Sequence, residues 1–115
     1  MRPRLAAGFL VLALVGGSVL TSCSGSGAQA LAGQACAHIE RGLAAAREAS
    51  SATPVRAAQL RTEVLNQIRL AVPLAAVAAG EDTTWQALEA TLSESSRVPV
   101  RYLLPALSAQ CAGVG

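Results

Sequence analysis

The first 23 residues constrain this chain most, because they determine how much of it remains to fold. Met1 to Arg4 carries two arginines, and the run from Leu5 to Leu20 is uncharged and rich in leucine, valine and alanine. A cationic start, an apolar run and a small-residue end are typical of a secretory signal. Removal of the residues before Cys23 would leave 115 − 22 = 93 residues, which suffices for one domain.

The end of the apolar run, Leu20-Thr21-Ser22-Cys23, resembles the lipobox of bacterial lipoproteins. With the Ala- and Gly-rich composition, the chain is similar to small lipoproteins of high-GC Gram-positive bacteria. The resemblance implies a diacylglycerol thioether on Cys23, cleavage before Cys23, and acylation of the new amino group, typically with palmitate. It implies a protein anchored by lipid to the extracytoplasmic face of the cell membrane, and nothing about activity.

Two other interpretations of this segment are open. An uncleaved membrane helix needs about 20 apolar residues, whereas Leu5 to Leu20 has 16 and is weakened by Gly16 and Gly17. A secreted protein that pairs Cys23 in a disulfide would leave an odd thiol, because the chain has three cysteines. Lipidation of Cys23 leaves an even pair, which favours the lipoprotein interpretation.

The residues after Cys23 predict a tether and then a neutral domain. Ser24 to Gln29 is small and flexible in composition, so we expect signal peptide 1–22, lipidated Cys23 and tether 23–30, and helical domain 31–115. Seven of the nine arginines and all seven acids follow Cys23, which gives the mature part a formal side-chain charge of zero. Nucleic-acid binding, which needs clustered cations, is therefore not expected.

Apolar residues recur at three- and four-residue steps, which predicts helices throughout the domain. The first is expected from about Leu31 to Ser50. The second begins with Thr53 as N-cap and Pro54 in the first turn, and ends at Gly80. Pro73 predicts a kink or break in it near residues 68–72.

The third helix is expected to open with a capping box, in which the Thr83 hydroxyl binds the amide of Gln86, and to end around Ser95. The fourth begins near Pro99, bends at Pro105, and has Val100, Leu103, Leu104, Leu107 and Cys111 on one side. The sequence thus predicts an all-α fold, a small four-helix up-down bundle with Pro-kinked helices tied by one disulfide.

The disulfide is expected between Cys36 and Cys111. In an up-down bundle the start of the first helix and the end of the fourth lie at the same pole, and export makes oxidation favourable. Closing a loop of about 75 residues would stabilise the fold by roughly 4 kcal/mol. A redox-active pair would need a Cys-x-x-Cys spacing, which these two cysteines lack.

No catalytic, metal or cofactor site is predicted. His38 is the single histidine and is expected to be exposed; with Cys36 and Cys111 it gives at most three zinc ligands, on different helix faces. The acidic residues Glu63, Glu89 and Glu94 are expected on separate solvated faces, and the serines fall in turns and tether. We therefore expect a non-enzyme without a cofactor.

The segment Ser93 to Tyr102 is the most distinctive of the domain. It has two interpretations: a recognition loop using Arg97, Arg101 and Tyr102, or a plain turn in which Val98 and Tyr102 pack against Trp85, which is the simpler of the two.

The expected function is a non-enzymatic interaction or structural module anchored at Cys23, with an unknown envelope protein or lipid as partner. The alternative is a carrier of a lipid or apolar small molecule. A pocket would indicate the carrier, whereas a filled core with an exposed Arg/Tyr patch would indicate the interaction module. That pocket is expected to be lined by Leu65, Val72, Leu103 and Leu107.

Overall fold

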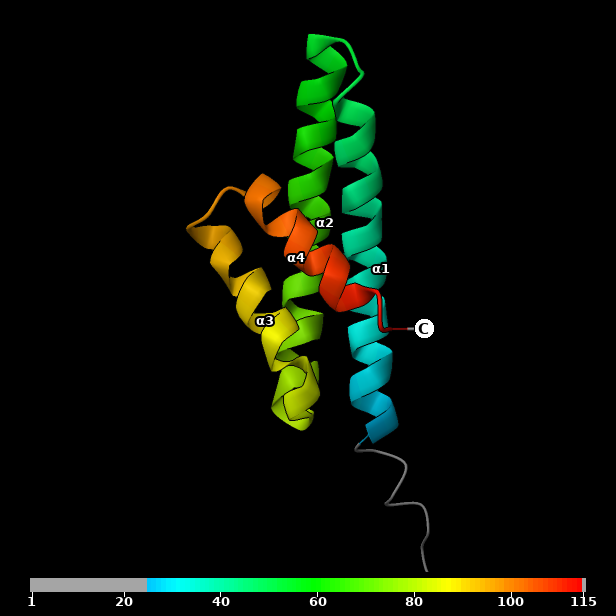
Figure 1. Ribbon diagram of the computed structural model, residues 1–115, viewed down its shortest axis with the longest axis vertical. Helices are drawn as coiled ribbons and strands as arrows, with labels where there is room; N and C mark the ends of the chain where they lie inside the picture. Colours follow the sequence, from blue (N-terminus) through cyan, green and yellow to red (C-terminus); the bar gives the residue numbers. More distant parts are fainter. Residues whose placement is uncertain (1–24, 115) are drawn as a thin grey trace, which may run out of the picture.

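The computed structural model describes residues 25–114 and confirms the all-α prediction (Figure 1). Four α-helices follow one another along the chain: α1 (Gly25–Ala49), α2 (Pro54–Glu81), α3 (Gln86–Ser93) and α4 (Val100–Cys111). Two short 3-10 turns, η2 (Thr83–Trp85) and η3 (Glu94–Ser96), flank α3. The described residues contain no strand.

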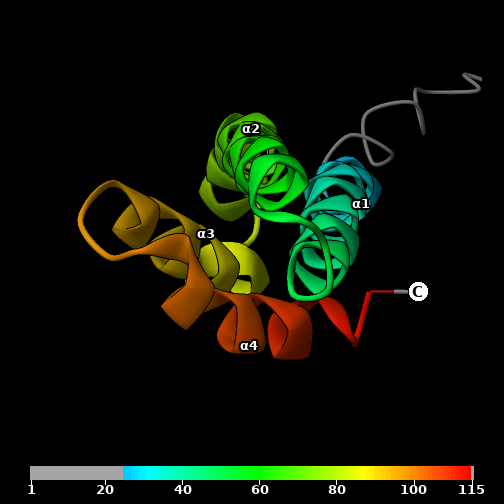
Figure 2. The same cartoon turned by 90° about the horizontal axis from the view of Figure 1, so that it is seen from above.

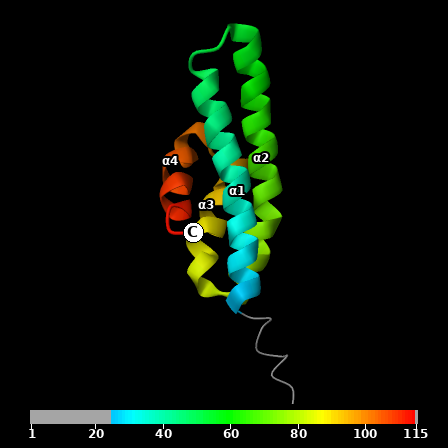
Figure 3. The ribbon, with the colours of Figure 1, turned by 90° about the vertical axis from the view of Figure 1, so that its right-hand side faces the viewer.

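The long helices α1 and α2 form an antiparallel hairpin, and α3 and α4 pack together on one side of it (Figures 2 and 3). Helix α4 crosses the hairpin obliquely, and the hairpin end around residues 50–53 extends beyond it (Figure 1). The end of the hairpin that carries the start of α1 and the end of α2 lies at the opposite pole. This difference in length leaves one part of the hairpin uncovered by α3 and α4.

Small side chains dominate the core between α1 and α2. Ala32 and Ala35 of α1 and Ala71 and Ala75 of α2 are fully buried, as is Leu107 of α4. Alanine stripes allow two helix backbones to approach closely. The largest fully buried residues are Ile39, Ile68, Leu92 and Leu107.

Helix α1 begins at Gly25, so the prediction of a tether over 23–30 and of a helix start at Leu31 is wrong for the residues from Gly25 onward. Ala28 is fully buried, and it continues the buried stripe of Ala32 and Ala35 by one more turn. The free energy gained by burying Ala28 outweighs the weak helix propensity of the neighbouring glycines and serine. The predicted signal peptide and Cys23 lie outside the described residues.

The start of α2 agrees with its sequence signal, but the start of α3 does not. Thr53 is the N-cap with extended backbone and Pro54 follows it, although the Thr53 side chain makes no capping bond within the described residues. The capping box predicted for Thr83 and Gln86 is wrong: the Asp82 carboxylate accepts a hydrogen bond from the Thr84 amide at 2.9 Å. A carboxylate at the N-cap is a stronger acceptor than a threonine hydroxyl, and it also complements the helix dipole.

Both internal prolines lie within continuous helices. Helix α2 runs through Pro73 and α4 through Pro105, so the break allowed for near residues 68–72 is not present. Pro73 and Pro105 are exposed. On a solvent-facing side, water can reach the carbonyl that loses its intrahelical donor, which lowers the cost of the proline.

Candidate functional site

The disulfide predicted between Cys36 and Cys111 is confirmed. The two Sγ atoms are 2.11 Å apart, the Cα atoms are 5.5 Å apart, and each residue is only 4% exposed. The bond joins the middle of α1 to the last residue of α4. It is a buried structural link, and it holds α4 against the hairpin.

An open groove of about 440 Å³ lies where α4 begins beside the α1–α2 hairpin. It exists because α4 starts at Val100 partway along the hairpin and leaves the distal part of α1 and α2 uncovered (Figures 1 and 3). All three of these helices contribute side chains, and most of them are apolar. The lining residues are Ala46, Ala49, Ser50, Arg61, Val64, Leu65, Pro99, Val100, Arg101 and Leu104.

Two arginines from different helices line this groove. Arg61 of α2 and Arg101 of α4 are both exposed. Among residues 25–114 the ion pairs are Arg56 with Glu48 and Arg97 with Glu94, so neither groove arginine is paired with a carboxylate there. The groove therefore combines an apolar floor with two cations that no carboxylate of residues 25–114 neutralises.

Arg101 also contacts the aromatic residue that follows it. Its guanidinium carbon lies 4.7 Å from the centre of the Tyr102 ring, and its Nη2 donates a hydrogen bond to the Tyr102 hydroxyl at 3.0 Å. Tyr102 is 63% exposed. The prediction that Val98 and Tyr102 pack against Trp85 is therefore wrong for Tyr102, whereas Trp85 itself packs against the core. The core is filled by aliphatic side chains, so the tyrosine stays at the surface.

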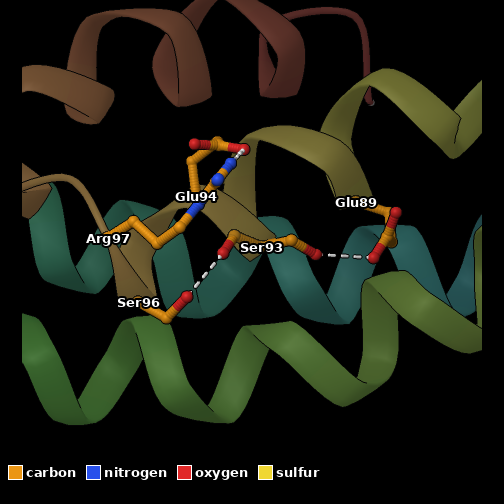
Figure 4. A network of polar contacts seen from close by, with 5 residues as sticks. All are labelled: Glu89, Ser93, Glu94, Ser96 and Arg97. Atoms are coloured by element: carbon orange, nitrogen blue, oxygen red, sulfur yellow. Dashed lines mark hydrogen bonds and ion pairs between the residues drawn. The ribbon is translucent and has the colours of Figure 1, made fainter.

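Arg97, the third residue predicted for interaction, is part of a local network at the α3–α4 turn (Figure 4). It pairs with Glu94, while the Ser93 hydroxyl donates to Glu89 at 2.6 Å and the Ser96 hydroxyl donates to the Ser93 carbonyl at 3.1 Å. These bonds hold the turn that positions the start of α4. Arg97 does not line the groove, so the structure brings together only Arg101 and Tyr102 of the three.

The four residues expected to line a carrier pocket do not enclose a common cavity. Leu107 is fully buried, and Val72 and Leu103 are partly buried against the core. Only Leu65 lines the groove, where 41% of it is exposed. Val72, Leu103 and Leu107 thus pack against or within the core, where they were expected to surround a ligand.

His38 is half-buried, and the prediction that it is exposed is wrong. Its Nδ1 lies 2.7 Å from the Gln67 side-chain oxygen, and the Gln67 amide donates to Glu63 at 2.8 Å. Because the Gln67 oxygen only accepts, this contact requires the proton on Nδ1. The described part of the chain contains no group of three or more His, Cys, Asp or Glu residues arranged to hold a metal ion.

No protein-family model, curated protein or solved structure matches the chain significantly. Between residues 25 and 114, none of the helices combines the length and the hydropathy needed to cross a bilayer.

Arg61 lines the groove, and the sequence patterns gave it no functional role. In the sequence, Arg61 is one of several polar residues on an amphipathic helix. Its partner Arg101 lies on a different helix and far along the chain, and only the placement of α4 brings the two to one groove.

Proposed function

We propose that this chain is a lipid-anchored, non-enzymatic module of the cell envelope that binds an acidic, partly apolar segment of another envelope protein. The observation that carries the proposal is the pair Arg61 and Arg101, which lines an apolar groove without a carboxylate partner in residues 25–114. The anchor is inferred from the lipobox at Leu20 to Cys23.

The side chains of the groove suit such a segment. Leu65 and Leu104 offer an apolar floor for a hydrophobic side chain, and the arginines offer planar, bidentate donors for carboxylates. Arginine and tyrosine are the residue types enriched at energetically important interface positions, and Tyr102 adds an exposed aromatic surface next to Arg101. Because the mature chain has no formal net charge, recognition would depend on these two local cations.

The shape of the groove favours a peptide segment over an enclosed small ligand. Small-molecule sites usually bury most of the ligand surface inside a concave pocket. Here the groove is open along the hairpin, and Leu107, expected in the wall of a carrier pocket, is fully buried in the core. A carrier of a lipid or apolar molecule is therefore the second candidate function.

The position of the groove along the hairpin also suits binding of another protein. Ala46 is 21 residues after Gly25, so the groove lies about 30 Å along α1 from the end that carries the anchor. This distance separates the groove from the lipid on Cys23 itself. A partner protein in the envelope could then reach it.

The test is photo-crosslinking in intact cells of the full-length, anchored chain. A photoreactive residue at Leu65 is expected to give a discrete adduct with one protein, through a segment rich in Asp or Glu. The same probe at Gln59, which is exposed on the other side of α2, is the matched control and is expected to give no such adduct.

Charge reversal then separates specific binding from chance proximity. The combined variant Arg61→Glu and Arg101→Glu is expected to abolish the Leu65 adduct, whereas Arg69→Glu, exposed on α2 outside the groove, is expected to leave it unchanged. An adduct that survives reversal of both groove arginines, or equal adducts at Leu65 and Gln59, contradicts the proposal.

A further inference from the structure

The outward side of the second half of α2 is apolar. From Leu70 to Gly80 the sequence has no polar or charged side chain. Ala71, Ala75 and Ala78 face the core, but Leu70 and Val77 are each 50% exposed. Exposed Pro73 and half-buried Leu74 lie between them at helical spacing i, i+3, i+4, i+7. These four residues form the apolar stripe of α2.

The same side of α2 is polar in its first half. Gln59, Glu63 and Asn66 are exposed and lie in the same direction as Leu70, at spacings of 11, 7 and 4 residues before it. A helix whose outward side faced only water would be expected to stay polar along its whole length. The change at Leu70 therefore confines an apolar surface to one end of the molecule.

That end is the one at which the chain leads to Cys23. Helix α2 ends beside the start of α1, since a Cβ atom on Gly27 would lie 3.6 Å from the Glu81 carboxylate. Cys23 precedes Gly25 by two positions, so the backbone between them spans at most about 7 Å. Along α2, Val77 lies about 6 Å and Leu70 about 16 Å before Glu81. The whole stripe is close to the expected lipid.

We propose that the apolar stripe is a membrane seat: it lies in the boundary between head groups and acyl chains when Cys23 carries its lipid. This inference rests on the lipid anchor of the proposed function. A formally neutral domain has no strong electrostatic attraction to a bilayer. Anchoring at Cys23 instead supplies a high effective concentration of membrane. Partial burial of a few apolar side chains is then enough to hold this side of the domain at the bilayer surface.

The seat is compatible with the groove. On α2, Leu65 of the groove and Leu70 of the stripe are five residues apart, which places them about 140° apart around the helix axis. By the same spacing Arg61 points about 180° away from Leu70. When the stripe contacts lipid, the groove faces away from the bilayer and stays accessible to a partner.

The experiment measures the depth of single positions in the bilayer. Variants Val77→Cys and Val55→Cys are expressed from the full-length sequence, and their lipidated products are isolated from membranes without reductant. Each new thiol is then labelled with an environment-sensitive fluorophore. Val55 is the matched control, because it is 72% exposed at the other end of α2. The labelled proteins are placed in phosphatidylcholine vesicles that contain nitroxide-bearing lipid.

The seat predicts that the label at position 77 is quenched by the lipid nitroxide about threefold more strongly than the label at position 55, and is shielded from aqueous iodide. Adding Leu70→Glu is expected to bring quenching at position 77 down to the level at position 55. Circular dichroism of that variant should be unchanged, because Leu70 is half-exposed and lies outside the core.

Each other outcome overturns the seat. Equal quenching at the two positions places the stripe in water. Shielding from iodide without nitroxide quenching, if it grows with protein concentration, shows that a second copy covers the stripe. Shielding in a chain that retains residues 1–22 assigns the cover to its own apolar run.

Intact mass distinguishes failure of the seat from failure of the anchor. A chain without a diacylglyceryl group removes the anchor as well, whereas a lipidated chain with an exposed label overturns only the seat.

Discussion

Cys36 in the middle of α1 is bonded to Cys111 at the end of α4, with their Cα atoms 5.5 Å apart and a sequence separation of 75 residues. This bond encloses most of the folded domain in one covalent loop. It also fixes the C-terminal end of α4. The N-terminal end of α4, at Val100 and Arg101, forms one side of the groove.

The first prediction concerns this bond. Intact mass without reductant should show two hydrogens fewer than after reduction, and the combined variant Cys36→Ser and Cys111→Ser should lose roughly 4 kcal/mol in free energy of unfolding, because its unfolded chain is no longer cross-linked. Denaturant unfolding measures the loss. Two free thiols in the native protein would rule the bond out.

The second prediction compares two leucines of equal size. Leu107→Ala should lower the free energy of unfolding by about 2 to 5 kcal/mol, because Leu107 is fully buried and its removal leaves a cavity. Leu70→Ala should change it by less than about 0.5 kcal/mol, because half of Leu70 already faces solvent. Urea unfolding of both variants provides the comparison. A large loss for Leu70→Ala would show that the apolar stripe serves the fold.

The third prediction concerns the Asp82 cap. The hydrogen bond from the Thr84 backbone amide, with a further contribution from the Thr84 side chain, lowers the pKa of Asp82 below its ordinary value of 3.8. The unfolded chain therefore takes up this proton more readily than the folded chain. The cap's contribution to stability is complete above the ordinary pKa and is lost as the pH falls through the lower folded value.

The variant Asp82→Asn isolates this effect, because its side-chain oxygen can accept the same bond but does not titrate in this range. Unfolding free energies at about pH 6 and about pH 3 should show the wild-type advantage over Asp82→Asn shrinking on acidification. A difference that is constant with pH, or that grows in acid, would contradict the assigned cap.

Much of the fold could be predicted from helical periodicity and proline signals. Pro54 marked the start of α2 correctly, because a proline in the first turn costs no hydrogen bond that the helix needs. The start of α1 could not be found in the same way. Gly25 to Gln29 has the composition of a linker, and only the folded structure shows that Ala28 is fully buried.

The caps and the groove needed the structure for a different reason. Thr83 and Asp82 are adjacent candidates for the same cap, and the geometry of η2 decides for the carboxylate. Arg101 and Tyr102 were marked as interaction residues by their type, but Arg61 gains its significance only from the position of α4 beside it. Periodicity defines faces of helices, and it does not define which faces end up uncovered.

Lipidation of Cys23 is the proposal on which the others depend, because the proposed partner binding and the proposed membrane seat both require a chain anchored there. The most direct measurement is the intact mass of the protein extracted from membranes of expressing cells, together with its Cys23→Ala variant. We expect a mature chain that begins at Cys23 and carries a diacylglyceryl group, and a variant that is neither lipidated nor retained in the membrane fraction. A wild-type chain that keeps its first 22 residues without lipid, or a Cys23→Ala variant that stays tightly in the membrane, would contradict it.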